Sequence, residues 1–205
     1  MTKMNLKQFF STILLSLAMF VIYLIGIMPV FAHQQLSIVL HAGVTALICG
    51  PAYVLMIAKS RASGTLFTTN ALFALFYLVV GNLHLFVFML AAGLICELVL
   101  LKGGYQSQRR QVIPYILLWS AVGLKNIFMF GLFRDAVLNT YLKTGMDETT
   151  AKIAIDNAAA TMLSVPLNLA GVAVTIIGGL AGFWLGKKAM KKYFIPAGVA
   201  ADNAQ

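Results

Sequence analysis

Charged residues are scarce in this sequence. Only 10% of the 205 residues are Asp, Glu, Lys or Arg, whereas 60% are hydrophobic. Soluble domains carry roughly 25% charged residues. The composition therefore excludes an ordinary soluble domain and predicts an integral membrane protein.

Cysteines and catalytic motifs are also nearly missing. Cys49 and Cys96 both lie in apolar runs and form no CxxC pair, so neither a disulfide nor a metal site is predicted. The sequence has no HExxH, GxSxG or GxxxxGK[ST] motif. We therefore expect no enzyme activity, no catalytic residue and no cofactor. Energy for uphill transport would have to come from an ion gradient or from partner subunits.

Nucleic-acid binding is not expected, although the formal net charge is +9. The basic residues fall in short groups between apolar runs and form no basic stripe on one face. Eleven of the fifteen are predicted to lie on the same side of the membrane. In membrane proteins the cytoplasmic loops carry an excess of Lys and Arg. Both termini should then be cytoplasmic, in a multi-pass protein of the cell membrane. The eleven are Lys3, Lys7, Lys59, Arg61, Lys102, Arg109, Arg110, Lys187, Lys188, Lys191 and Lys192.

Long apolar runs are what the sequence does contain, and about 20 such residues span a bilayer as a helix. The first run is longer than the core of a signal peptide, so we expect a retained helix despite the V-x-A sequence of Val30 and Ala32. The prediction is a single all-α membrane domain over residues 1–205 with six transmembrane helices. These cover about 9–31, 35–58, 65–81, 83–101, 112–133 and 159–186.

The last outer loop, residues 134–158, is predicted to contain a short extra helix. Gly145 is a helix stop, Asp147 is a candidate N-cap, and Glu148 falls in the first turn. This helix could be a lid over a pocket or a simple connector.

Few ionisable groups lie within the predicted spans, and such groups are usually functional. With a rise of 1.5 Å per residue, Glu97 and Lys125 differ by about 10 Å in depth, so we do not expect a direct ion pair. Glu97, near the inner end, is expected to make a structural or partner contact.

Polar side chains from four spans fall at similar depth in the outer half, which predicts an outward-facing, water-accessible substrate pocket. Each has a structural alternative. His41 could bond a neighbouring helix, Asn168 could satisfy backbone groups freed near Pro166, and Lys125 could snorkel outward. The predicted substrate-binding residues are His41, Asn82, His84, Lys125, Asn126 and Asn168.

Small residues recur at four-residue spacing on two spans. Gly178, Gly182 and Gly186 on the last span predict a close helix contact, most simply within the protein. Thr12 and Ser16 on the first span form a weaker version of this face.

Several segments resemble a known family. Residues 50–64, GPAYVLMIAKSRASG, resemble the Gly-Pro-x-Tyr…Ala-Lys…Gly signature of the MptD, or Trep_Strep, family of S components of energy-coupling factor (ECF) transporters. The segment GLICELVLLKGGYQSQRR is similar at Gly93, Glu97, Gly104, Tyr105 and Ser107. GMDETTAKIAI resembles the outer-loop segment of the family, and GGLAGFWLGKKAMKKYFIPAGV resembles its C-terminal end.

The resemblance implies six helices and a substrate pocket that opens to the outside. It also implies partners: a T-type transmembrane coupling protein and two ATP-binding ATPase subunits, all acting at the lipid bilayer. The substrate would be a small nutrient such as a vitamin, a vitamin precursor or a haem-like compound. The related proteins often dock on the T protein through an Ala-x-x-x-Ala face of the first span, and Thr12 and Ser16 are the nearest equivalent here.

Two other functions fit the sequence. A secondary transporter driven by protons could use His41 or Glu97, and it would need no ATPase partner. A membrane structural or assembly protein would bind no small ligand, and alanine substitution of His41 or Lys125 would leave its function intact.

Overall fold

The structure is a computed structural model that describes residues 4–27, 33–101 and 103–199, and the regular structure of these residues is entirely helical. The all-α prediction is confirmed for this part of the chain. Lys3, Lys102, Val30 and Ala32 and the predicted end of the first span at 28–31 lie outside the described residues.

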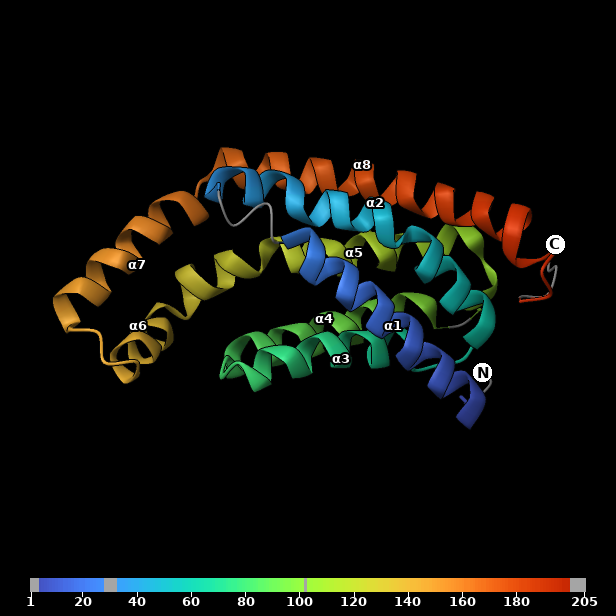
Figure 1. Cartoon of the computed structure of the whole chain (residues 1–205), viewed down its shortest axis with the longest axis horizontal. Coiled ribbons are helices and arrows are strands. Elements are labelled where there is room, and N and C mark those ends of the chain that lie inside the picture. The colour runs from blue at the N-terminus through green and yellow to red at the C-terminus, as the bar shows by residue number, and fades with distance from the viewer. Residues whose placement is uncertain (1–3, 28–32, 102, 200–205) are drawn as a thin grey trace.

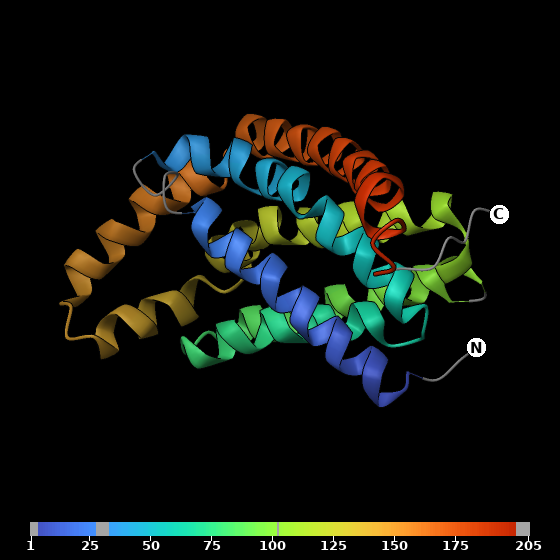
Figure 2. The same ribbon diagram turned by 45° about the vertical axis from the view of Figure 1, so that its right-hand side comes forward.

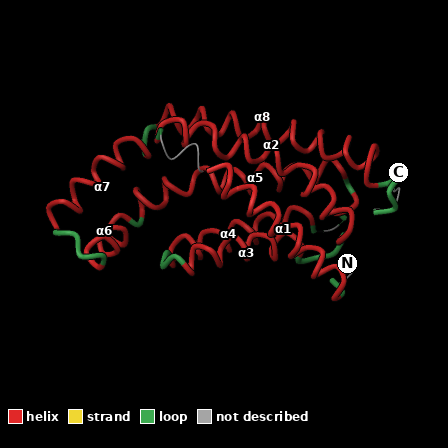
Figure 3. The backbone as a smooth tube through the Cα atoms, viewed as in Figure 1, coloured by secondary structure: helices red, strands yellow, loops and turns green. Residues whose placement is uncertain are grey.

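Six of the described helices run roughly along the long axis of the molecule and form a bundle (Figure 1). A hairpin of two further helices, α6 (Arg134–Lys143) and α7 (Glu148–Met162), extends beyond one end of it. Short turns make most of the other connections (Figure 3). The bundle consists of α1 (Leu6–Ile27), α2 (Gln34–Ser60), α3 (Thr65–Val79), α4 (Leu83–Leu100), α5 (Gln108–Ile127) and α8 (Val165–Ala189).

Within the part of the chain that the structure describes, five segments are long and apolar enough to cross a membrane. The helix α3 is also apolar, but its 15 residues make it shorter than the rest. At 1.5 Å per residue it covers about 22 Å of a hydrocarbon core that is about 30 Å thick. The five segments are Leu6–Gly26, Gln34–Ser60, Leu83–Leu100, Gln108–Leu132 and Val165–Phe194.

The helices α2 and α8 lie side by side along most of their length (Figures 1 and 2). Glycines make this possible. The backbone of Gly43 faces Gly178, and the backbone of Gly50 faces Gly182 and Gly186, so that a Cβ atom at any of these positions would collide with the other helix. The prediction that the glycine face packs within the protein is therefore confirmed. We call this contact the glycine seam.

Aromatic side chains fill the centre of the bundle. Trp119 of α5, Tyr23 of α1 and Phe73 of α3 are almost fully buried, with ring centroids 5.8 to 6.4 Å apart. Large apolar side chains are also exposed on the outside of the bundle. On α1 an exposed row of large apolar residues runs the length of the helix, as expected for a surface in contact with lipid. The row consists of Leu6, Phe10, Leu14, Leu17, Val21 and Ile25.

The last outer loop contains more helix than the sequence predicts. The expected helix is α7, and Asp147 is its N-cap, with its side chain accepting a hydrogen bond from the Thr150 N–H at 2.9 Å. The helix α6 was not predicted. The predicted start of the sixth span at 159 is also wrong, because α7 ends at Met162 and α8 begins only at Val165.

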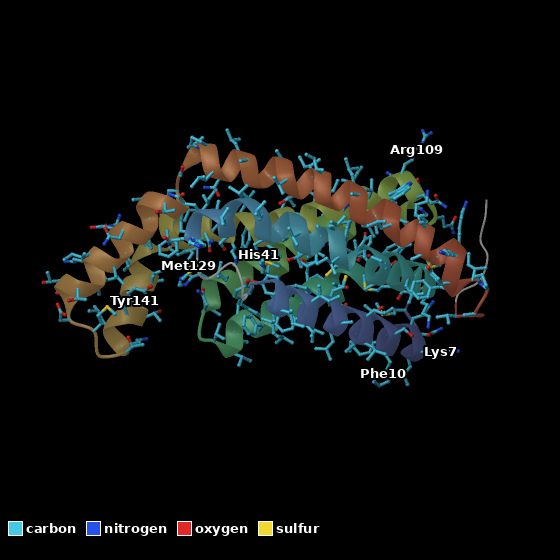
Figure 4. The ribbon with its side chains drawn as sticks, turned by 45° about the horizontal axis from the view of Figure 1, so that its top comes forward. Lys7, Phe10, His41, Arg109, Met129 and Tyr141 are labelled. Carbon is cyan, nitrogen blue, oxygen red and sulfur yellow. The ribbon has the colours of Figure 1, made fainter. Side chains whose placement is uncertain are left out.

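Nine of the thirteen described basic residues lie at the end of the bundle opposite to the α6–α7 hairpin, which we call the basic end. The other four, Lys125, Arg134, Lys143 and Lys152, lie in the last turn of α5 and in the hairpin. In Figure 4, Lys7 of α1 and Arg109 of α5 both lie at the basic end, and Figure 1 places the beginning of α1 and the end of α8 there. The basic groups after α2 and α8 follow the ends of helices that run toward it. The two ends of the molecule therefore differ strongly in charge.

Candidate functional site

A cavity of about 280 Å³ lies where the α6–α7 hairpin meets the bundle. One wall is the turn between α3 and α4, residues 80–85, and the opposite wall is one side of α6. Met129 and Phe133, from the segment that joins α5 to α6, form part of the lining. We call this space the outer cavity, after the side of the membrane that the sequence predicts for this end of the bundle.

Two of the predicted substrate-binding residues line the outer cavity. Asn82 is the N-cap of α4, where its side chain accepts a hydrogen bond from the Leu85 N–H at 3.1 Å. His84 is exposed, and its ring lies 4.5 Å from that of Phe133. The Asn82 cap holds the turn between α3 and α4 in place. The His84 ring packs against the Phe133 ring.

His41 lies deeper, in the half of the bundle nearer to the hairpin (Figure 4). Its side chain is only 4% exposed, and its ring centroid is 5.0 Å from that of Tyr23. The Nε2 atom is buried and has no hydrogen-bond partner among the described residues. A buried polar atom without a partner costs free energy, and Nε1 of Trp119 in the aromatic core is in the same situation among the described residues.

Lys125 is partly buried near the outer end of α5. Its ammonium group donates a hydrogen bond to the Val122 carbonyl of the same helix at 3.1 Å. It does not line the outer cavity. Among the described residues Lys125 forms no ion pair with Glu97, as the difference in their predicted depths indicated, and the Glu97 carboxylate has other partners.

Asn126 and Asn168 both contact the end of α7. The Asn126 amide lies 3.2 Å from the sulfur of Met162. Asn168 donates to the carbonyls of Met162 and Ser164 at 2.8 and 2.9 Å. The Ser164 carbonyl also accepts from the backbone N–H of Asn168 at 3.0 Å, so the side chain supplies a second donor there and a donor to Met162 at the break between α7 and α8. The structural alternative for Asn168 therefore describes its position well.

Thr12 and Ser16, predicted to dock a partner, face the inside of the bundle and are fully buried. The Thr12 hydroxyl is 2.7 Å from that of Ser60 on α2, and the Ser16 hydroxyl donates to Thr69 of α3 at 2.9 Å. They join α1 to two neighbouring helices and are not on a surface open to a partner.

Glu97 has a structural contact at the basic end of the bundle. Its carboxylate accepts hydrogen bonds from the N–H groups of Gly64, Leu66 and Phe67 at 2.7, 3.1 and 3.4 Å, and so caps the N-terminus of α3. The Tyr105 hydroxyl is a fourth donor at 2.7 Å. Burial, and then the charge of Glu97, raise the pKa of Tyr105, which keeps this hydroxyl protonated.

Sequence reasoning missed the contribution of α6 to the outer cavity. Asn139 and Lys143 lie one turn apart on the same side of this helix, and both line the cavity together with Tyr141. The signal was present in RDAVLNTYLK, where Val137 and Tyr141 are spaced as on one face of a helix.

Comparison with known proteins identifies the family of the chain. A family described as "Hypothetical bacterial integral membrane protein (Trep_Strep)" matches residues 6–195. The chain belongs to this Trep_Strep family. The membrane prediction is thereby confirmed, and so is the Trep_Strep part of the resemblance. No curated protein and no solved structure matches the chain.

Proposed function

We propose that this Trep_Strep protein is the substrate-binding S component of an ECF-type importer. The observation that carries the proposal is the outer cavity, which lies between the α3–α4 turn and α6 at the end of the bundle opposite to the basic residues. The substrate is a small nutrient: a vitamin, a vitamin precursor or a haem-like compound. It enters from outside, since the cavity is at the outer end in the orientation proposed below.

The proposed orientation has six spans and both termini in the cytoplasm of the cell membrane. The helix α3 is counted as a span because it packs along α4 and α1 inside the bundle, although it is short. The basic residues at the end of the bundle that carries both termini favour the cytoplasm for that end.

The topology can be measured with single-cysteine variants in a background in which Cys49 and Cys96 are replaced by alanine. A membrane-impermeant maleimide added to intact cells is expected to label Thr144→Cys in the α6–α7 hairpin. It should leave Arg109→Cys unlabelled until the membrane is permeabilised. Labelling of both variants in intact cells would contradict the orientation.

The energy for import is proposed to come from partner subunits, because the sequence has no phosphate-binding loop. The partners are a T-type transmembrane coupling protein and two ATP-binding ATPase subunits. The test is expression with and without such a module: uptake of the compound that copurifies with the chain, identified by mass spectrometry, should require an ATPase that can hydrolyse ATP. Uptake at an unchanged rate with a hydrolysis-deficient ATPase would overturn the proposal.

One observation favours a second candidate, a proton-coupled transporter. The unpaired Nε2 atom of His41 is buried and could take up a proton during a transport cycle. Uptake by this mechanism would need no ATPase and would stop when the proton gradient is collapsed. His41→Gln should then uncouple uptake from the gradient, whereas an ATPase-dependent importer would keep its dependence on ATP.

A further inference from the structure

The outer cavity has an uneven charge. Lys143 projects from the last turn of α6 and lines it, whereas none of the described lining residues is acidic. Lys143 forms no ion pair with a described residue. Asp135, the acidic residue nearest along α6, does not line the cavity, and Arg134 pairs with Asp156 of α7. An unneutralised ammonium group at a cavity wall attracts an anion.

Polar groups near Lys143 could share that anion. Asn139 is one turn before Lys143 on α6, so both side chains leave the helix on the same face. The Thr140 hydroxyl is already used, since it donates to the Ala136 carbonyl at 2.9 Å. An ammonium and an amide on one face form a mixed donor set of the kind that binds a carboxylate.

Several other lining residues are apolar or aromatic. The His84 and Phe133 rings lie 4.5 Å apart at an interplanar angle of 35°, and Met129 continues the same wall. Flat apolar molecules pack on such surfaces, because ring faces and thioethers give large contact areas. The volume of about 280 Å³ limits the occupant to a small molecule.

We propose that the outer cavity binds a small organic anion with a flat apolar body. Lys143 and Asn139 bind the carboxylate, and the body packs against Phe133, Met129 and the His84 ring. The inference rests on the proposed function, in which this cavity is the substrate site. It gives the anion-binding role to Lys143 of α6 and not to Lys125, whose ammonium group bonds the backbone of its own helix.

The probes for the test are 2-naphthoate and its neutral analogue 2-naphthamide. Their binding to the purified full chain in lipid nanodiscs is measured by equilibrium dialysis against empty nanodiscs of the same lipid. Naphthoate is expected to bind about tenfold more tightly than naphthamide, or better, because only naphthoate carries the negative charge that the Lys143 ammonium group attracts. Lys143→Gln should remove this preference while leaving naphthamide binding unchanged.

Two control variants test the assignment. Lys152→Gln removes a charge on the same hairpin that is paired with Glu148 and does not line the cavity, and it should keep the full preference. Lys125→Gln should keep it as well. Equal binding of the two probes, loss of the preference in Lys125→Gln, or no binding of either probe to the unmodified chain would each overturn the inference. None of these outcomes affects the proposed function, which is decided by ATPase-dependent uptake.

Discussion

The carboxylate of Glu97 on α4 and the hydroxyl of Tyr105 on the following turn are 2.7 Å apart, and the same carboxylate caps α3. Glu97 is a charged residue inside an apolar span, and its presence there is explained because it caps the neighbouring N-terminus of α3. Both residues belong to the segment that carries the family resemblance. Their pairing gives that segment a structural role at the basic end of the bundle, far from the outer cavity.

Removing the Tyr105 hydroxyl should destabilise the protein. A hydrogen bond to a buried charge contributes about 1.5–3 kcal/mol, so Tyr105→Phe should lower the melting temperature by several degrees. Glu97→Leu should lower the melting temperature further, because it leaves the N–H groups at the start of α3 without their acceptor. Thermal unfolding in detergent measures both. Glu148→Gln is the control, since that carboxylate is exposed, and a Tyr105→Phe melting curve equal to the unmodified one would contradict the role.

The glycine seam should not tolerate a methyl group. In Gly182→Ala the new Cβ would lie 2.9 Å from the Cα of Leu47 and closer still to the Ala46 carbonyl, so α2 and α8 would have to separate. Overpacking of this kind costs about 1–3 kcal/mol or more. Gly131→Ala is the matched control, because its Cβ would meet only Leu163 at an ordinary 3.6 Å. Size-exclusion profiles and melting temperatures of the two variants should differ clearly.

Capping by Asp147 predicts a pH dependence for the start of α7. The hydrogen bond from Thr150 lowers the pKa of Asp147 below its ordinary value of 3.8, so the charged form is stabilised in the folded helix. The contribution is complete above the ordinary value and is lost as the pH falls through the lowered one. Hydrogen exchange of residues 148–152 at neutral pH should be faster in Asp147→Ala. Unchanged exchange there would argue against the cap.

Asn168 should hold the corner between α7 and α8. In Asn168→Ala the Met162 carbonyl loses its side-chain donor, at a cost of about 1–3 kcal/mol, whereas the Ser164 carbonyl keeps the backbone N–H of residue 168. We expect faster exchange in α7 and little change in α4. Naphthoate binding in the outer cavity should be weakened only slightly, because Asn168 does not line it. A complete loss of binding with unchanged exchange would instead make Asn168 a ligand-binding residue.

Hydropathy located the bundle well, because long apolar runs report directly on lipid-spanning helices. It failed at the sixth span, where Ala158–Leu163 is apolar enough to continue the run toward α8. The break there depends on Ser164 and Pro166, whose effect on the helix is local and does not change the mean hydropathy. The helix α6 was missed for the opposite reason, since it is polar and exposed.

The candidate site was predictable only in part. Depth estimates placed His41, Asn82 and Lys125 in one half of the bundle, but depth does not say which way a side chain points. The hydrogen bonds of Asn82 and Asn168 depend on the shape of turns, which the hydrophobic periodicity of the sequence does not reveal. Thr12 and Ser16 have the small-residue spacing of a docking face, yet their hydroxyls find partners on α2 and α3.

The glycine seam also bears on the order in which the protein is assembled during synthesis. Its two halves are far apart in the sequence, with Gly43 and Gly50 on α2 and their partners on α8. More than a hundred residues must be made after α2 before α8 can cover it. Until then the small-residue face of α2 lacks α8 and contacts lipid or the insertion machinery in its place. A chain truncated before α8 would carry that face permanently, which makes it a natural target for membrane proteases.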